Sequence, residues 1–351
     1  MYRIADRDLQ RFAEDVLRAA GLAPEDASAI AAGLVMADLR GVTSHGVFRL
    51  MQYTESVRDG QINPTPSVRV LEQRGATALV DADGGYGYRP TVIAMDLSID
   101  LARSFGVGVV GVRNSHHFGA AAFYTVRAAE EKFIGICTTT TQARLAPPGA
   151  AEAAVGNNPI SVGIPRRDPH LPIILDMALS EVALGKIRIA AAEGRSIPSS
   201  WGFDRRGRPT TNPAEVLAGG FLAPIGSYKG FGLSVAIEVL AGVLTESPFG
   251  LHADNHRGRS GGVGHLLMAI NPALFTDLGT FFNGVEDLIE QIKSRPLAEG
   301  SEAIYLPGEI EWIHFRERKQ AGVPVSAEIA EQLEGLADAL GVERPRWLTM
   351  P

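Results

Sequence analysis

Apolar positions recur at helical spacing at both ends of the chain. Near the start, Asp6 stands where a helix cap is expected and Gly21 where that helix should end. A second helix is predicted from Pro24 to about Leu39, because proline fits the first turn of a helix. Gly341 closes a similar stripe near the other end. The apolar stripes are formed by Leu9, Phe12, Val16, Leu17, Val285, Leu288, Ile289, Ile292, Ile329, Leu333, Leu336 and Leu340.

Between these ends the pattern changes to short apolar runs that alternate with alanine-rich segments of helical spacing. This alternation predicts a central α/β layer. We therefore expect a discontinuous helical domain, residues 1–75 with 300–351, and a central domain of residues 76–299. The expected strands cover residues 76–81, 107–112, 133–138, 160–164 and 172–176, and the expected helices cover residues 91–105, 118–131 and 230–244.

Composition and charge narrow the class of protein. A chain of 351 residues with 45% hydrophobic residues can bury a large core and is long enough for two domains. The net charge is −7 and no stripe of lysine and arginine is present, so neither a nucleic acid nor an anionic membrane is an expected partner. The first segment lacks the apolar core of a signal peptide, and we expect a cytoplasmic protein. The single cysteine, Cys137, excludes a disulfide framework and is expected to be a buried hydrophobe.

Two adjacent histidines provide the strongest chemical signal. His116 and His117 follow a β-branched run and precede Gly119, so they are predicted to lie on a strand-to-helix loop. The partial positive charge of a helix N-terminus there would favour a neutral imidazole that can accept a proton. The alternative is a pair of structural histidines that satisfy local hydrogen bonds.

Other motifs are less specific. Residues 106–111 match the dinucleotide fingerprint G-x-G-x-x-G, but these glycines are predicted inside a strand that follows a helix, so we do not assign them to a cofactor. Residues 252–256 contain His252 and His256, yet they lack the support of a second ligand cluster, and we expect no metal. Residues 226–232 could form a turn or an anion site beside a helix. Asp176 or Ser180 could hold a ribose hydroxyl or cap the following helix.

Taken together, a series of segments resembles the malate/L-lactate dehydrogenase family of the non-Rossmann type. That family also contains ureidoglycolate, sulfolactate and diketogulonate dehydrogenases and the Δ1-piperideine-2-carboxylate reductases. The resemblance extends from about Asp6 to about Gly341. The matching segments are residues 38–41, 44–46 with Arg49, 113–115, 117–119, 146–147, 156 with 158–159, 175–178 with Ser180, 185–187, 207 with 209–211, 228–230 and 306–309.

The resemblance implies an NAD(P)-binding domain with a mainly antiparallel sheet, a homodimer, and NAD or NADP as cofactor. It implies that His117 is the general acid and base. The substrate, a small carboxylate, would be held by Ser44, His45, Arg49 and Thr141. The implied cofactor-binding residues are Asp176, Met177, Ala178, Lys229, Pro307, Gly308 and Glu309.

The chain also departs from the family pattern. Residues 139–144 replace a usual threonine-asparagine-serine-proline segment, and Tyr88 replaces a usual glutamine. We expect Thr140 and Tyr88 to line the substrate pocket, where Arg144 could pair with a second acidic group or project into solvent.

The expected reaction is hydride transfer between the cofactor and C2 of a 2-hydroxy acid, while His117 exchanges the hydroxyl proton and Arg49 grips the carboxylate. One alternative on the same scaffold is reduction of a cyclic imino acid, Δ1-piperideine- or pyrroline-2-carboxylate. Another is a catalytically silent relative that only binds its ligand.

Overall fold

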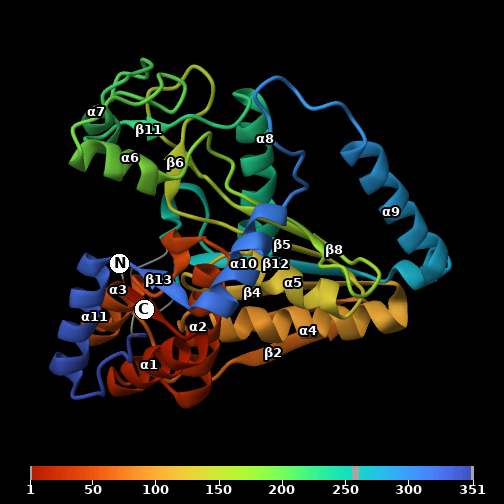
Figure 1. Ribbon diagram of the computed structural model, residues 1–351, viewed down its shortest axis with the longest axis horizontal. Helices are drawn as coiled ribbons and strands as arrows, with labels where there is room; N and C mark the ends of the chain where they lie inside the picture. The colour runs from red at the N-terminus through yellow and green to blue at the C-terminus, as the bar shows by residue number, and fades with distance from the viewer. Residues whose placement is uncertain (1, 255–260, 349–351) are drawn as a thin grey trace.

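The computed structural model describes residues 2–254 and 261–348. It is a mixed α/β protein, as predicted (Figure 1). The helices are α1 (Asp6–Ala19), α2 (Pro24–Leu39), η1 (Thr43–His45), α3 (Arg49–Arg58), α4 (Tyr88–Phe105), α5 (Ala122–Glu130), α6 (Leu184–Ala192), α7 (Pro213–Leu217), α8 (Tyr228–Ile237), η2 (Glu238–Val243), η3 (Gly250–His252), η4 (Pro272–Leu274), α9 (Leu278–Lys293), α10 (Glu309–Ala321) and α11 (Ala327–Leu340). The strands are β1 (Tyr2–Ile4), β2 (Arg69–Arg74), β3 (Thr77–Asp81), β4 (Val107–Ser115), β5 (Ile134–Thr139), β6 (Ala143–Leu145), β7 (Val155–Gly156), β8 (Ile160–Ile164), β9 (Ile173–Met177), β10 (Gly202–Phe203), β11 (Phe221–Leu222), β12 (Val263–Ile270) and β13 (Val323–Val325).

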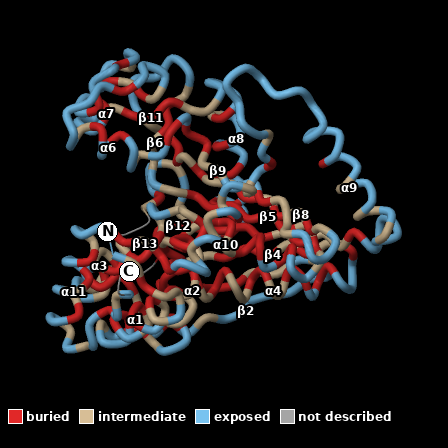
Figure 2. Tube along the Cα trace, viewed as in Figure 1, coloured by how far each residue is buried: buried red, intermediate tan, exposed pale blue. Residues whose placement is uncertain are grey.

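The main sheet has 7 strands in the order β2-β3-β4-β12-β5-β8-β9. Only the β3–β4 pair is parallel, and the other neighbours are antiparallel. Helices α4 and α5 pack on strands β4, β12, β5 and β8, while the π-helical segment η2 also packs on β4, β12 and β5. Figure 2 shows buried residues along this sheet, and also among the helices near the termini and around β6 and β11. The core of the sheet includes Cys137, which is a free and fully buried thiol, as expected.

The glycines of residues 106–111 serve the packing of this sheet. Gly106 ends α4 in the left-handed conformation with φ 84°, and Gly108 and Gly111 lie within β4, as predicted. A Cβ atom at Gly108 would lie 2.0 Å from the carbonyl oxygen of Ser98 on α4. These glycines therefore allow helix and strand to approach each other, and they do not stand at a strand-to-helix turn.

The two ends of the chain share one core. Strand β1 pairs with β13, and helix α1 packs against α2, α3 and α11. The buried residues of this cluster come from residues 4–88 and 323–337. A smaller sheet of 4 strands, β10-β11-β6-β7, lies apart from this cluster in Figure 1 and carries α6 and α7.

Two predictions about helix ends are wrong. Asp6 does not cap α1, because Ala5 occupies the cap position and Asp6 is the first helical residue. Residues 230–244 do not form one α-helix. Instead α8 begins at Tyr228 and changes to π-helical hydrogen bonding at Glu238, whose carboxylate accepts bonds from the backbone nitrogens of Gly156 and Gly250. The prediction that Gly341 ends α11 is confirmed.

No helix in the described ranges has the length and apolar character needed to cross a membrane.

Candidate active site

The loop between β4 and α5 carries His117, as the sequence predicts. His265 of β12 lies beneath this loop and is fully buried. Its Nε2 lies 2.8 Å from the Ser115 hydroxyl, its Nδ1 lies 2.7 Å from the Thr139 hydroxyl, and its ring stacks on Phe118 at 4.6 Å. Burial lowers the pKa of His265 to about 3, so this imidazole is neutral and structural. The contacts of His265 with Ser115 and Phe118 therefore hold this loop against β12.

The His117 ring contacts two other elements. Its Nδ1 lies 2.6 Å from the Tyr53 hydroxyl of α3, and the Gly119 backbone N–H donates to the same nitrogen at 3.3 Å. The His45 ring stacks on His117 with 5.6 Å between centroids. The Tyr53 hydroxyl in turn lies 3.1 Å from the Tyr88 hydroxyl. The imidazole orientation is therefore set by a chain of hydroxyl groups and by a second imidazole.

Residues 43–49 bring three predicted substrate residues to the same place. The Ser44 hydroxyl lies 2.9 Å from His45 Nδ1, and Arg49 Nε donates to the Ser44 carbonyl oxygen at 3.0 Å. Arg49 Nη1 donates to Gln52 Oε1 at 2.7 Å. Burial, reinforced by the Arg49 charge, lowers the pKa of His45 to about 4, so His45 is neutral at neutral pH. Ser44, His45, Arg49 and His117 therefore form one cluster of polar side chains, which we call the polar centre.

This segment is held by a buried carboxylate at the end of α2. Asp38 Oδ2 accepts a hydrogen bond from the Val47 backbone nitrogen at 2.8 Å. A Cβ atom at Gly46 would lie 1.8 Å from Asp38 Oδ1, so only glycine fits beside this carboxylate. Burial raises the pKa of Asp38 to about 7. Gly46 therefore has a packing role.

Tyr53 was not anticipated by the sequence analysis, although it follows Arg49 by one helical turn on α3. That spacing places both side chains on one face, which is the signal that would have found it. Burial raises the pKa of Tyr53 to about 12 and that of Tyr88 well above its usual value. Both hydroxyl groups therefore remain protonated at neutral pH.

Tyr88 does not line an open pocket. Tyr88 and Thr140 are each 1% exposed, so the expectation that they face the substrate is wrong. A Cβ atom at Gly33 would lie 2.4 Å from the Tyr88 ring, and one at Gly119 would lie 2.5 Å from its hydroxyl. The ring is therefore wedged between α2 and the loop of His117, and its hydroxyl contacts Tyr53, which in turn contacts His117.

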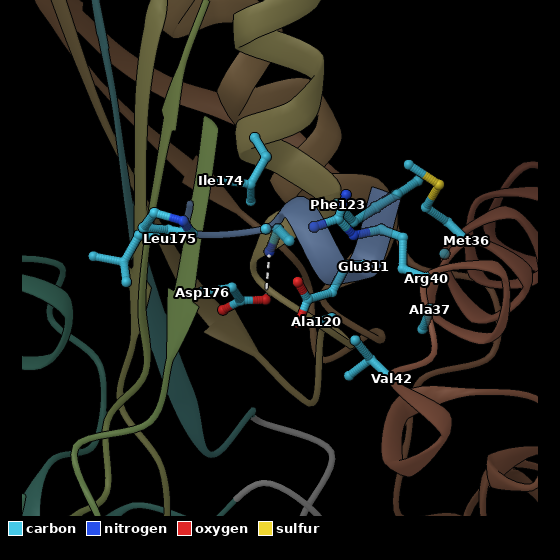
Figure 3. Close-up of a pocket in the computed structure, with 14 residues that line it drawn as sticks. Met36, Ala37, Arg40, Val42, Ala120, Phe123, Ile174, Leu175, Asp176 and Glu311 are labelled. Atoms are coloured by element: carbon cyan, nitrogen blue, oxygen red, sulfur yellow. Dashed lines mark hydrogen bonds between the residues drawn. The ribbon is translucent and has the colours of Figure 1, made fainter. Parts of the chain in front are cut away.

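A cavity of about 300 Å³ lies beside the same loop, among α2, β9 and the start of α10 (Figure 3). Three of the residues predicted to bind the cofactor line it: Asp176, Pro307 and Gly308. Arg40 and Glu311 also line it. In Figure 3 the charged groups of Arg40, Asp176 and Glu311 point toward one another from three different elements.

Asp176 connects this cavity to helix α5. Its Oδ2 accepts a hydrogen bond from the Ala122 backbone nitrogen at 3.0 Å, so it caps the start of α5 and not the helix that follows it in sequence. Although the side chain faces the cavity, the surrounding protein desolvates it and raises its pKa to about 6. Glu311 adds to this rise, while Ala122 and Arg40 oppose it.

The remaining predicted site residues lie neither in the cluster of polar side chains around His117 nor on the wall of the cavity beside Asp176. Met177 ends β9 and Ala178 follows it. Glu309 accepts from Lys293 Nζ at 2.6 and 2.7 Å and from the Leu306 nitrogen at 2.8 Å, which ties α10 to α9. Thr141 donates to Asn157 and Asn158 at 3.1 and 3.2 Å. Lys229 is exposed in the first turn of α8.

No group of histidine, cysteine or carboxylate side chains within the described ranges could hold a metal ion. Asn255 and His256, from the possible metal cluster, lie outside those ranges.

Arg144, which the sequence analysis considered as a partner for a second acidic group, donates to Gln142 at 2.7 Å.

Comparison with known proteins gives consistent matches over nearly the whole chain. A family model described as malate/L-lactate dehydrogenase matches residues 4–334. Malate dehydrogenase of Pyrococcus abyssi is 36% identical over 97% of this chain and 96% of its own length. L-sulfolactate dehydrogenase of Methanocaldococcus jannaschii is 38% identical over 93% of this chain and 94% of its own length.

Solved structures of dehydrogenases and of a reductase also superimpose on nearly the whole chain. Malate dehydrogenase from Entamoeba histolytica superimposes with a TM-score of 0.93 at 30% identity, covering 98% of this chain and 99% of its own. Delta1-piperideine-2-carboxylate reductase from Pseudomonas syringae superimposes with a TM-score of 0.88 at 32% identity, covering 96% of this chain and 100% of its own.

Proposed function

Because the chain belongs to the malate/L-lactate dehydrogenase family and is an NAD(P)-dependent 2-hydroxy acid dehydrogenase, we propose that His117 is its general acid and base. The observation that carries this proposal is the contact of His117 Nδ1 with Tyr53 at 2.6 Å, beside Ser44, His45 and Arg49. The substrate is a small 2-hydroxy acid, and the product is the corresponding 2-oxo acid.

The proton step uses the ring nitrogen opposite Tyr53. A bound nicotinamide cofactor would supply the hydride-acceptor chemistry for C2 of the hydroxy acid. The hydroxyl proton passes to Nε2 of His117, and in the reverse direction the imidazolium returns it to the forming alkoxide. For Nε2 to accept a proton, Nδ1 must carry one, so in the reacting tautomer the long 3.3 Å contact from the Gly119 N–H is given up and Nδ1 donates to the Tyr53 oxygen 2.6 Å away. The Tyr53 hydroxyl then donates to Tyr88, which lies 3.1 Å away.

Arg49 would bind the carboxylate of the substrate. Its planar guanidinium can offer two parallel N–H groups to a carboxylate, a geometry that lysine does not provide. Ser44 and Gln52 already orient the side chain. Neutral His45 and the Ser44 hydroxyl can donate to the remaining substrate oxygens, and Thr141 is a further proposed contact.

The cavity beside Asp176 fits part of a dinucleotide, NAD or NADP. Asp176 can accept from ribose hydroxyl groups, and the backbone turn at Pro307 and Gly308 forms the opposite wall. A Cβ atom at Gly308 would lie 2.7 Å from the carbonyl oxygen of Ile174, so the wall stays close to β9. The other proposed cofactor contacts are Met177, Ala178, Lys229 and Glu309.

We also propose that the terminal helical cluster, residues 1–75 with 300–351, binds substrate and forms a homodimer. In this proposal residues 76–299, with their mainly antiparallel sheet, bind the cofactor. Exposed apolar side chains on α10 of the terminal cluster support dimerisation, because exposed apolar surface favours association: Ile310 and Ile313, about one helical turn apart, are 46% and 39% exposed.

The second candidate function is NAD(P)H-dependent reduction of a cyclic imino acid. The likeness to delta1-piperideine-2-carboxylate reductase favours it. The same carboxylate grip and proton donor would serve a C=N acceptor in place of a C=O acceptor.

A substrate panel tests both functions. Purified protein is mixed with NADH or NADPH and with 2-oxo acids, including oxaloacetate, pyruvate and 3-sulfopyruvate, or with Δ1-piperideine- and pyrroline-2-carboxylate. We expect oxidation of one reduced cofactor with an oxo acid. Turnover of the imino acids alone would establish the second function, and binding without any turnover would contradict both.

A further inference from the structure

Arg40 is a buried cation whose hydrogen-bonding capacity is unused. It follows α2 directly, is only 3% exposed and lines the cavity beside Asp176. In the described part of the chain, its Nε and Nη1 atoms have no hydrogen-bond partner. The guanidinium lies over the Trp312 ring at 4.4 Å, and Trp312 is itself fixed by a 2.8 Å bond from Nε1 to the Pro172 carbonyl oxygen.

The absence of hydrogen bonds needs an explanation because buried polar groups are nearly always paired. Burial lowers the pKa of Arg40, while Glu311 and Asp176 attract its charge without bonding to it. A guanidinium held flat on an aromatic ring presents its edge in a fixed plane. That edge matches two oxygens of one phosphate or carboxylate group.

Asp176 and Glu311 limit which anion fits. An anion without hydrogen-bond donors would be repelled by both side chains, and Arg49 already serves the substrate carboxylate in the proposed site. A nucleotide suits the cavity better, because its phosphate meets the cation while its ribose hydroxyls donate to the two carboxylates.

We propose that Arg40 binds a phosphate group of the dinucleotide cofactor through the cavity formed by α2, β9 and α10. This inference rests on the proposed function, since it assigns a residue to the cofactor of that reaction. The two possible sources of the phosphate are the pyrophosphate, common to NAD and NADP, and the 2′-phosphate of NADP.

The test measures binding without turnover. Dissociation constants for adenosine, 2′-AMP, ADP-ribose and NADH are determined by calorimetry for wild type, R40M and R40K. Methionine has a similar length and can cover Trp312 without a charge, and lysine keeps the charge but loses the planar fork. R316M is the matched control, because Arg316 lies exposed on the same helix as Trp312, outside this cavity.

We expect R40M to bind ADP-ribose and NADH about 10- to 100-fold more weakly than wild type, because charge-assisted bonds are lost. R40K should lie between them, and adenosine binding should be unchanged in all variants. A selective loss for 2′-AMP with normal ADP-ribose binding would assign Arg40 to the 2′-phosphate. Unchanged binding of both phosphate ligands, or an equal loss for adenosine, would overturn the inference.

Thermal unfolding separates a ligand role from a structural one. Lysine keeps the positive charge that faces Asp176 and Glu311, so the apparent Tm of ligand-free R40K should match that of wild type. A large drop in Tm for both R40M and R40K would show a structural role and overturn the inference. If wild type binds neither NADH nor NADPH, the proposed function itself fails.

Discussion

Two neighbouring regions, the surroundings of His117 and the cavity beside Asp176, share helix α2 and the β4–α5 loop. They differ in how far their polar side chains are hydrogen-bonded within the protein. Around His117, the polar groups are already paired: the Tyr53 hydroxyl with His117, the Ser44 hydroxyl with His45, and the Arg49 guanidinium with the Ser44 carbonyl oxygen. In the cavity, Arg40 keeps nitrogen atoms without hydrogen bonds, within the described residues. In the function proposed above, the first region is preorganised for a proton transfer, whereas the second is completed by its ligand.

The largest test of this comparison is removal of the imidazole. H117A should reduce kcat by about 10²- to 10⁴-fold, the usual contribution of a general acid or base. The dissociation constant for NADH should not change, since the proposed cofactor contacts do not include His117. Steady-state kinetics and a fluorescence titration give the two values, and full activity of H117A would remove His117 from the mechanism.

Replacing Arg49 with lysine should have the next largest effect. R49K keeps the charge but loses the planar fork, so kcat/KM for the acid should fall by about 10- to 100-fold. NADH binding again serves as the control. If kcat/KM is unaltered, Arg49 does not bind the substrate carboxylate.

Tyr53 is expected to matter less than either, because it acts through His117. Y53F should lower kcat by about 10-fold with little change in KM, since the ring loses the hydrogen bond that orients Nδ1. Y86F is the matched control: Tyr86 is equally buried and packs on Tyr53, but its hydroxyl donates to the Tyr53 carbonyl oxygen. An equal fall of kcat in both variants would point to packing and contradict a positioning role for the Tyr53 hydroxyl.

The smallest expected effect is the change of NADH affinity with pH, which we attribute to Asp176 in the cavity. Asp176 has a pKa of about 6, so lowering the pH from 7 to 5 protonates it and weakens bonds that need its negative charge. NADH affinity of wild type should fall by about 5-fold over this range, and D176N should show little pH dependence. Calorimetry at pH 5, 6 and 7 measures this. An identical pH dependence in D176N would assign the change to another group.

The position of His117 could be predicted from the sequence because its determinants are local. A β-branched strand that stops before a glycine and an alanine-rich helix defines the loop by itself. The same holds for helix α2, which begins at Pro24 and ends at Leu39 as expected. The cap at Asp6 was wrong because a single acidic residue fits equally well at the cap and in the first helical turn.

The surroundings of the site depend on contacts between distant segments, which local patterns do not encode. Strand β12 lies between β4 and β5, so His265 reaches beneath the loop from far along the chain. The cavity at Arg40 likewise closes only when α10, near the end of the chain, packs beside α2. Neither could be inferred from spacing alone.

The wedged position of Tyr88 has a consequence for natural variation. Gly33 lines the cavity proposed for the cofactor, and a methyl group there would also displace the tyrosine that packs on Gly119. The sizes of the side chains at positions 33, 88 and 119 are therefore coupled, because a larger side chain at either glycine would clash with the tyrosine ring. Among homologous sequences, a bulkier residue at position 33 should accompany a smaller side chain at position 88, even though position 33 belongs to a helix of the terminal core.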